Sequence, residues 1–244
     1  MKNKLKLFGT GIIMLLLIGF YSCTKEDESV DNVVTQSAAV AGLDYGQAHN
    51  DIIDSYYNRN DRTTLTLAEK IALVDDYFVQ EGITPLFSEM VTQNRDLELF
   101  LIDMNDNDHT LTYYANMFDS LHVSGYSTER ELAYQLDVID ALVENSEVVN
   151  QRAVIDNLRD LAMVEDFLVE ASRQRVLGGL DITMDSMDYW TSQGRGVPWY
   201  TKDAMGALYA WNSGIAAWAC AVTANPAAGA AVVIGVAAVS SMLD

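Results

Sequence analysis

The segment 103–108 contains the side chains that come nearest to a metal site. Asp103, Asn105 and Asn107 have the alternate spacing of a calcium-binding loop, whose side-chain oxygens bind the ion. Such a loop needs glycine at its sixth position and a bidentate glutamate at its twelfth, where this chain has Asp108 and Tyr114. Because two requirements fail, we interpret the segment as a polar loop between helices.

His49 is a second candidate, because an imidazole can serve as a metal ligand or a general base. The apolar residues of the segment 43–60 recur at helical spacing, and His49 lies on their face. A core histidine held by a polar partner has the same pattern. We favour that interpretation and expect a hydrogen bond to Asn50 or to a residue of another helix.

Aromatic and glycine residues gather in the segment 188–200, which includes Trp190, Trp199 and Tyr200. These rings could stack on a ligand. They could also pack a linker onto the body of the protein, which is the interpretation we favour. Cys220 stands among alanines with no base nearby in the sequence, so we interpret it as a small buried apolar residue.

Recurrent catalytic motifs are absent from the sequence. There is no Gly-rich phosphate loop, His-Glu-x-x-His helix, Cys-x-x-Cys pair or Gly-x-Ser-x-Gly turn. With 35 acidic residues, close carboxylate pairs arise by chance and carry little information. We therefore expect no catalytic residue, metal or cofactor. The formal net charge of −20 repels phosphate backbones and argues against nucleic acid as a partner.

Helical periodicity and capping signals predict an all-α fold for residues 43–244. Asp44 is a plausible N-cap, and Thr66-Leu-Ala-Glu69 and Thr128-Glu-Arg-Glu131 are capping boxes. Thr84-Pro85 predicts another helix start, and Gly82 a helix end. A long helix is expected over about 147–177, stopped by Gly178-Gly179. Short connections between helices predict an antiparallel multi-helix bundle.

The chain carries no charged residue between 204 and 243, although one residue in five is charged overall. Two apolar arms, 204–224 and 227–243, meet at Asn225-Pro226, where proline breaks one helix and opens the next. Gly206, Ala210 and Gly214 stand four apart, and Gly235 continues such a small-residue strip in the second arm. Small residues at this spacing let helices approach closely. The arms therefore predict a Gly/Ala-rich helical hairpin.

Three interpretations of this hairpin are open. It could be the core around which the amphipathic helices of 43–190 pack. It could be a membrane-inserting hairpin, as in some bacteriocins and pore-forming toxins. It could be a docking surface for a protein partner. We favour the core, because Ala and Gly contribute little to membrane insertion and neither arm has Lys or Arg flanks.

The first 22 residues have the three parts of a secretory signal. Lys2, Lys4 and Lys6 precede an apolar core over 12–18, and small Ser22 precedes Cys23. A signal that ends at a small residue and a cysteine resembles a bacterial lipoprotein signal, with Cys23 as the acylated residue. The box Phe20-Tyr-Ser-Cys23 departs from the commonest form and resembles the relaxed boxes of Bacteroidota lipoproteins.

The residues after Cys23 extend this resemblance. Lys25, Glu26 and Asp27 resemble the surface-export signal of Bacteroidota lipoproteins, a lysine followed by two acids. An acidic tether alone would look the same. We thus expect a signal peptide (1–22), a flexible acidic tether (23–42) and one helical domain (43–244), with amphipathic helices over 43–190 and the apolar hairpin over 198–244. The tether sequence is typical of a flexible spacer.

From these features we expect an envelope lipoprotein, anchored in the outer membrane and exposed at the cell surface. Its expected role is non-enzymatic binding or interaction, with the membrane as one partner through the anchor and a protein as a possible second partner. The alternative is a membrane-active, bacteriocin- or toxin-like protein that acts through residues 204–243.

Overall fold

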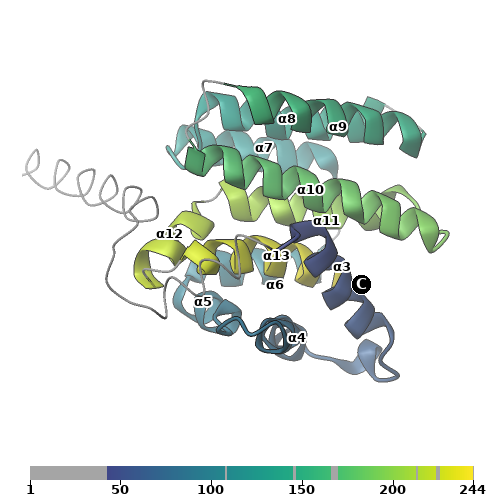
Figure 1. The fold of residues 1–244 in the computed structure, drawn as a ribbon, viewed down its shortest axis with the longest axis vertical. Coiled ribbons are helices and arrows are strands. Elements are labelled where there is room, and N and C mark those ends of the chain that lie inside the picture. The colour runs from purple at the N-terminus through teal and green to yellow at the C-terminus, as the bar shows by residue number, and fades with distance from the viewer. Residues whose placement is uncertain are drawn as a thin grey trace, which may run out of the picture.

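The computed structural model describes residues 43–107, 109–144, 147–165, 170–212, 214–223 and 226–243. All regular structure in these ranges is helical, so the expected all-α multi-helix bundle is confirmed (Figure 1). The helices are α3 (Tyr45–Tyr57), η1 (Arg62–Thr64), α4 (Leu67–Gln80), α5 (Phe87–Gln93), α6 (Arg95–Asp106), α7 (Leu111–Val123), α8 (Glu129–Glu144), α9 (Val148–Val164), α10 (Glu170–Ser192), α11 (Val197–Asn212), α12 (Ile215–Thr223) and α13 (Pro226–Met242).

The predicted capping signals begin helices where the sequence places them. The Asp44 side chain accepts the backbone N–H of Gln47 and caps α3. Thr66 and Glu69 form a reciprocal capping box at α4. At α8 the Thr128 hydroxyl accepts the Glu131 N–H at 3.2 Å, and the Glu131 carboxylate accepts the Thr128 N–H at 2.9 Å. These local bonds satisfy backbone donors that a helix start leaves free.

The expected helix start at Thr84-Pro85 is wrong. Helix α5 begins at Phe87, and its first N–H groups are capped from another helix. Asp75 of α4 accepts the N–H of Phe87 at 2.8 Å and of Ser88 at 3.1 Å. A tertiary cap therefore replaces the local one, which a sequence pattern cannot reveal.

The long helix expected over 147–177 is two helices, and Gly178-Gly179 does not end the second. Helix α9 ends at Val164, where Arg173 donates to the backbone oxygens of Ala162 and Glu165. Helix α10 runs through both glycines to Ser192. A Cβ at residue 178 would lie 3.0 Å from the Tyr45 ring, and one at 179 would lie 2.9 Å from Trp211. Both glycines therefore serve close packing instead of termination.

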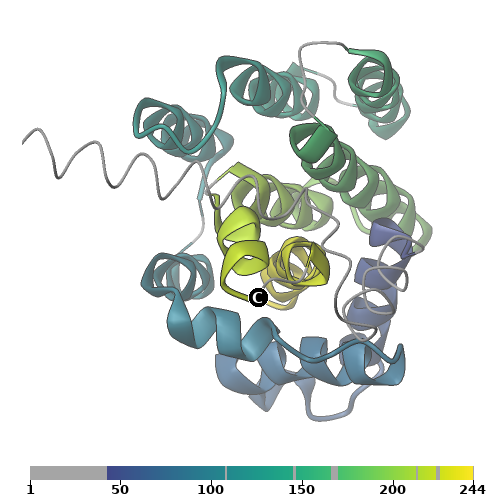
Figure 2. The same cartoon turned by 60° about the vertical axis from the view of Figure 1, so that its left-hand side comes forward.

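Helices α11 and α13 lie inside the bundle, and the helices that precede them in the chain are arranged around them (Figure 2). Helix α13 packs against α3, α4, α5, α6, α10, α11 and α12. Its residues from Ala228 onward are buried, and most have no exposed surface. A helix that is apolar on all sides is stable in water only when it is enclosed in this way. Among the described residues, no helix meets the length and hydropathy needed to cross a bilayer.

The first apolar arm is two helices, because the chain turns at Gly214. The φ of Gly214 is +70°, a conformation that glycine adopts at low cost. Helix α11 precedes this turn and α12 follows it, so the predicted hairpin pairs α11 and α12 with α13. The second arm corresponds to α13, which begins at Pro226.

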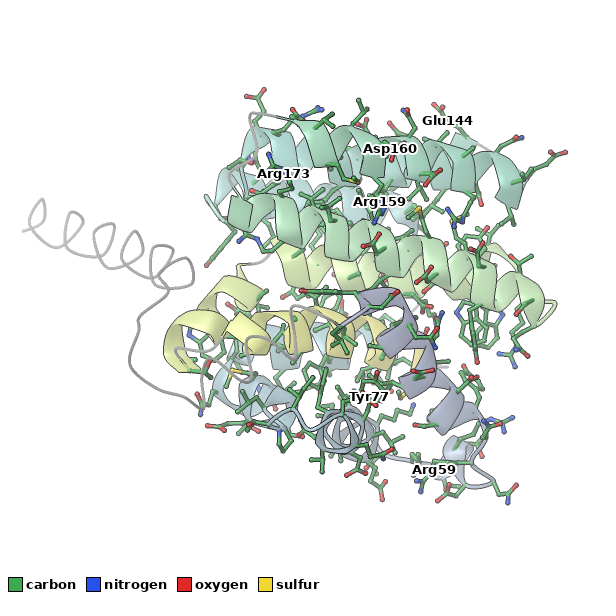
Figure 3. The ribbon with its side chains drawn as sticks, viewed as in Figure 1. Arg59, Tyr77, Glu144, Arg159, Asp160 and Arg173 are labelled. Atoms are coloured by element: carbon green, nitrogen blue, oxygen red, sulfur yellow. The ribbon has the colours of Figure 1, made fainter. Side chains whose placement is uncertain are left out.

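Charged side chains cover the outside of this arrangement. Glu144 at the end of α8 and Asp160 on α9 are exposed and project from the outer helices (Figure 3). Arg159 of α9 bonds Asp181 of α10. The apolar arms thus lie in the core, and exposed acidic residues cover the outer helices and face the solvent.

Candidate functional site: a buried polar cluster at the end of the apolar core

Five polar side chains from four helices meet beside the last turn of α13. His49 comes from α3, Ser186 and Trp190 from α10, Asp203 from α11 and Ser241 from α13. Each is at most 2% exposed. The helices bring them together because each residue lies on the core-facing side of its own helix. This group is named here the buried polar cluster.

The Asp203 carboxyl is the hub of the buried polar cluster. Trp190 Nε1 donates to Oδ2 at 2.8 Å, and the Ser241 hydroxyl donates to Oδ1. His49 Nε2 lies 3.4 Å from Oδ2. The carboxyl therefore ties the indole of α10 and the hydroxyl of α13 to helix α11. A buried carboxyl without such partners would be strongly destabilising.

The imidazole of His49 is oriented by its neighbours. Its Nδ1 is 3.0 Å from Asn50 Oδ1, which confirms the expected core histidine bonded to Asn50. Because an amide oxygen only accepts, Nδ1 carries the proton in this contact. In the neutral ring Nε2 is then a bare acceptor that faces Asp203. This arrangement suits a protonated Asp203, whose O–H can point at Nε2.

The electrostatics of the pair agree with this assignment. Burial raises the pKa of Asp203 to about 7, although the hydrogen bonds from Trp190 and Ser186 and the charge of Lys202 act in the opposite direction. Burial lowers the pKa of His49 to about 4, opposed by its hydrogen bond with Asn50. Both shifts have one cause, which is the cost of charge in an apolar core. At mildly acidic pH the pair is therefore neutral.

The order Ser186, His49, Asp203 superficially matches a hydrolase triad, since Ser186 Oγ lies 3.4 Å from His49 Nδ1. The protonation state argues against that chemistry. Nδ1 already carries a proton toward Asn50 and cannot accept another from the serine hydroxyl. All three side chains have no exposed surface, so no substrate reaches them in this conformation. The buried polar cluster is arranged to hold helices together.

Two further contacts hold the same end of α13. Tyr57 of α3 donates its hydroxyl to the backbone oxygen of Ser241 at 3.1 Å. Lys202 of α11 donates Nζ to the backbone oxygen of Leu243 at 2.7 Å. Both bonds satisfy carbonyls that a helix C-terminus leaves without partners. The lysine charge also suits the negative end of the helix dipole.

In the calcium-like segment 103–108, the carboxylate of Asp103 is bonded to nearby residues of the same chain. Asp103 lies in the last turn of α6, where its Oδ2 is 2.7 Å from His109 Nε2 and accepts the Tyr113 hydroxyl at 2.9 Å. Its Oδ1 accepts Asn107 Nδ2 at 2.9 Å, and Asp108 lies outside the described residues. Within the described ranges no group of three His, Cys, Asp or Glu side chains could hold a metal ion.

The aromatic segment packs on the bundle. Trp190 is buried on Asp203, and the buried Tyr200 donates its hydroxyl to Gln151 Oε1 at 2.6 Å. Arg195, between α10 and α11, lies 3.9 Å over the Trp199 ring and also within cation–π distance of Tyr57 and Trp190. The rings of this segment thus pack against residues of the same chain, and Arg195 makes cation–π contacts with Trp190 and Trp199.

The predicted packing residues of the hairpin occupy different environments. A Cβ at Gly206 would lie 2.6 Å from Ser240 Oγ and 3.0 Å from Ala237 Cα, so α11 and α13 touch closely there. Ala210 is fully buried. Gly214 forms the turn before α12, near the Tyr126 ring. Gly235 faces the Phe87 ring of α5, at 2.7 Å from a Cβ built there. Its close contact is therefore with α5 and not with the first arm.

The remaining predicted residues lie outside the described part of the chain. These are the lipidation residue Cys23, the export-like residues Lys25, Glu26 and Asp27, and the hinge residue Asn225. Pro226 opens α13, but its side chain is not described, and the same holds for the side chain of Cys220 in α12.

Asp203, the centre of the buried polar cluster, is not among the residues predicted from the sequence. A signal was present, because Asp203 precedes Ala207 by four residues and Ala210 by seven on the apolar face of α11. A lone acid on such a face predicts a buried, partnered carboxyl. Comparison with protein families, with characterised proteins and with solved structures finds no match for this chain.

Proposed function

We propose that this protein is an envelope lipoprotein, acylated at Cys23 and held at the outer membrane, with its helical body as a non-enzymatic interaction module. The observation that carries the proposal is the leader, a basic and then apolar segment that ends at Ser22-Cys23. The charged shell around an apolar core supports a soluble body carried on a tether. The Lys25-Glu26-Asp27 stretch supports exposure at the cell surface.

The negative charge of the protein supports a protein partner over a nucleic acid. The formal net charge is −20 and sequence pI is about 4.2, so the body favours basic or apolar protein surfaces over nucleic acid. The polar side chains of the buried polar cluster are enclosed in the core, away from solvent. These two observations favour binding through the acidic exterior.

Metabolic labelling with palmitate tests the anchor. Wild-type protein should take up label and sediment with membranes. A Cys23→Ala variant should lose both properties, whereas Cys220→Ser should keep them. Label that persists in the Cys23→Ala variant would overturn the assignment. Protease treatment of intact cells tests exposure, and replacement of Lys25, Glu26 and Asp27 by alanine should protect the protein.

A second candidate function, membrane insertion through residues 204–243, is favoured by one specific observation. Helix α13 is enclosed by other helices over its described length and carries no charged residue. A helix that is apolar all round can be enclosed either by protein or by lipid. The folded bundle would then store this helix until it meets a membrane.

A reversible crosslink tests the second candidate. The ideal Cβ of residue 206 lies 3.0 Å from the Ser240 Cβ, close to the roughly 3.5–4.5 Å of a disulfide. In a Cys220→Ser background, Gly206→Cys with Ser240→Cys should block dye release from vesicles when oxidised and restore it when reduced. Absence of dye release from wild-type and reduced protein alike would exclude this function.

A further inference from the structure

The hydrogen bonds described between α13 and other helices gather at its C-terminal turn. Ser241 donates to Asp203 of α11 and accepts from Tyr57 of α3 through its backbone oxygen. Leu243, directly after the helix, accepts from Lys202. By contrast, Ser240 donates within its own helix, to the Val236 oxygen at 2.8 Å. In the earlier turns of α13, the described side chains from Ala228 onward are buried and apolar, so these turns contact the bundle through apolar groups.

We propose that Tyr57, Lys202 and Asp203 form a latch on the last turn of α13, and that opening this latch is the step that exposes α13 to a lipid surface. This inference rests on the second function proposed above. The latch residues come from α3 and α11, so it joins α13 to both of these neighbours.

The physical reason is the difference between apolar and polar contacts on leaving the core. Lipid tails are as apolar as the side chains that enclose α13, so the move to lipid replaces one apolar environment by another. The latch bonds have no equivalent in lipid, and breaking them leaves polar groups without partners. The latch bonds therefore oppose the release of α13 into lipid, because they are lost on release. The apolar contacts oppose it less, because contacts with lipid replace them.

The interior geometry supports a latch that opens from this end. Gly206 allows α11 and α13 to touch at Ala237 and Ser240, within the turn that leads to Ser241. The chain entering α13 begins at Pro226, which starts a new helix and has no N–H to hold it to a preceding turn. Of the hydrogen bonds described for α13, those at its C-terminal turn are the ones that reach other helices, so their loss leaves its described residues held by close packing.

The experiment compares latch variants of the full chain with a matched control. Ser241→Ala removes the hydroxyl bonded to Asp203, and Ser240→Ala removes a hydroxyl that bonds only within α13. Tyr57→Phe removes one hydroxyl and is the mildest latch variant, so it serves if Ser241→Ala fails to fold. Amide hydrogen exchange along α13 reports release, and dye release from phosphatidylglycerol and phosphatidylethanolamine vesicles reports membrane action.

We expect exchange in the last turns of α13 to rise about three- to tenfold in Ser241→Ala and Tyr57→Phe, the effect of losing one hydrogen bond. Dye release should also rise in Ser241→Ala and Tyr57→Phe. Ser240→Ala should match wild type in both exchange and dye release. Faster exchange without dye release would support the latch and overturn the membrane function. Dye release that is equal in all variants, with unchanged exchange, would overturn the latch and leave the membrane function standing.

Discussion

His49 Nε2 and Asp203 Oδ2 lie 3.4 Å apart in the core, and burial moves the pKa values of the two groups in opposite directions. The Asp203 pKa of about 7 lies above the ordinary carboxyl value. The stability that this shift contributes is therefore present at low pH and is lost as pH rises through 7. The His49 pKa of about 4 lies below the ordinary imidazole value. Its contribution is therefore present above pH 6.5 and is lost as pH falls through 4.

Between about pH 4 and 6.5 these two contributions change with opposite sign, so they offset each other. A variant that keeps only one of the two groups should show the pH dependence of the group that it keeps. Relative to wild type, Asp203→Asn should lose about 1 kcal/mol of unfolding free energy per pH unit as the solution is acidified from 6.5 to 4.5. His49→Gln should gain about as much. Urea titrations at several pH values measure both, and parallel profiles for the three proteins would contradict the pairing.

The contact of Gly206 with α13 predicts a sensitive packing position. In Gly206→Ala the new Cβ meets Ser240 Oγ at 2.6 Å and Ala237 Cα at 3.0 Å, and the backbone atom cannot move aside without shifting the helix. We expect a loss of about 1–3 kcal/mol. Gly196→Ala is the control, since nothing lies within 4 Å of a Cβ there. Equal urea midpoints for the two variants would argue against close packing of α11 on α13.

Asp75 should act as a cap despite its place in another helix. Asp75→Ala removes the acceptor of the first two N–H groups of α5 and should cost about 1–2 kcal/mol. Asp76 is its exposed neighbour on α4, and Asp76→Ala should leave stability within about 0.5 kcal/mol of wild type. Thermal melts of the two variants decide between a tertiary cap and a general charge effect.

Glu131 combines a local and a long-range role. It closes the capping box with Thr128, and its Oε1 lies 3.1 Å from Arg175 Nη2 of α10, with the carboxylate nearly buried. Glu131→Ala should therefore cost about 2–4 kcal/mol, because it removes a cap and breaks a largely buried ion pair. Glu129→Ala, at an exposed position of the same turn, should be close to neutral in the same denaturation assay.

Sequence patterns predicted those parts of the fold that depend on neighbouring residues. The capping boxes at Thr66 and Thr128 and the core position of His49 are confirmed, because the interactions lie within three or four residues. The cap from Asp75 and the packing role of Gly178 depend on contacts between helices distant in the chain. Asp203 was missed for the same reason, since its four partners come from three other helices.

The order of the helices along the chain has a consequence for biosynthesis. The helices around α13 all precede it, so a chain emerging from its N-terminus presents their apolar faces before the segment that covers them exists. Folding of the described body therefore waits for α13, which follows those helices in the chain. Until α13 has been made, those apolar faces are uncovered and prone to aggregation.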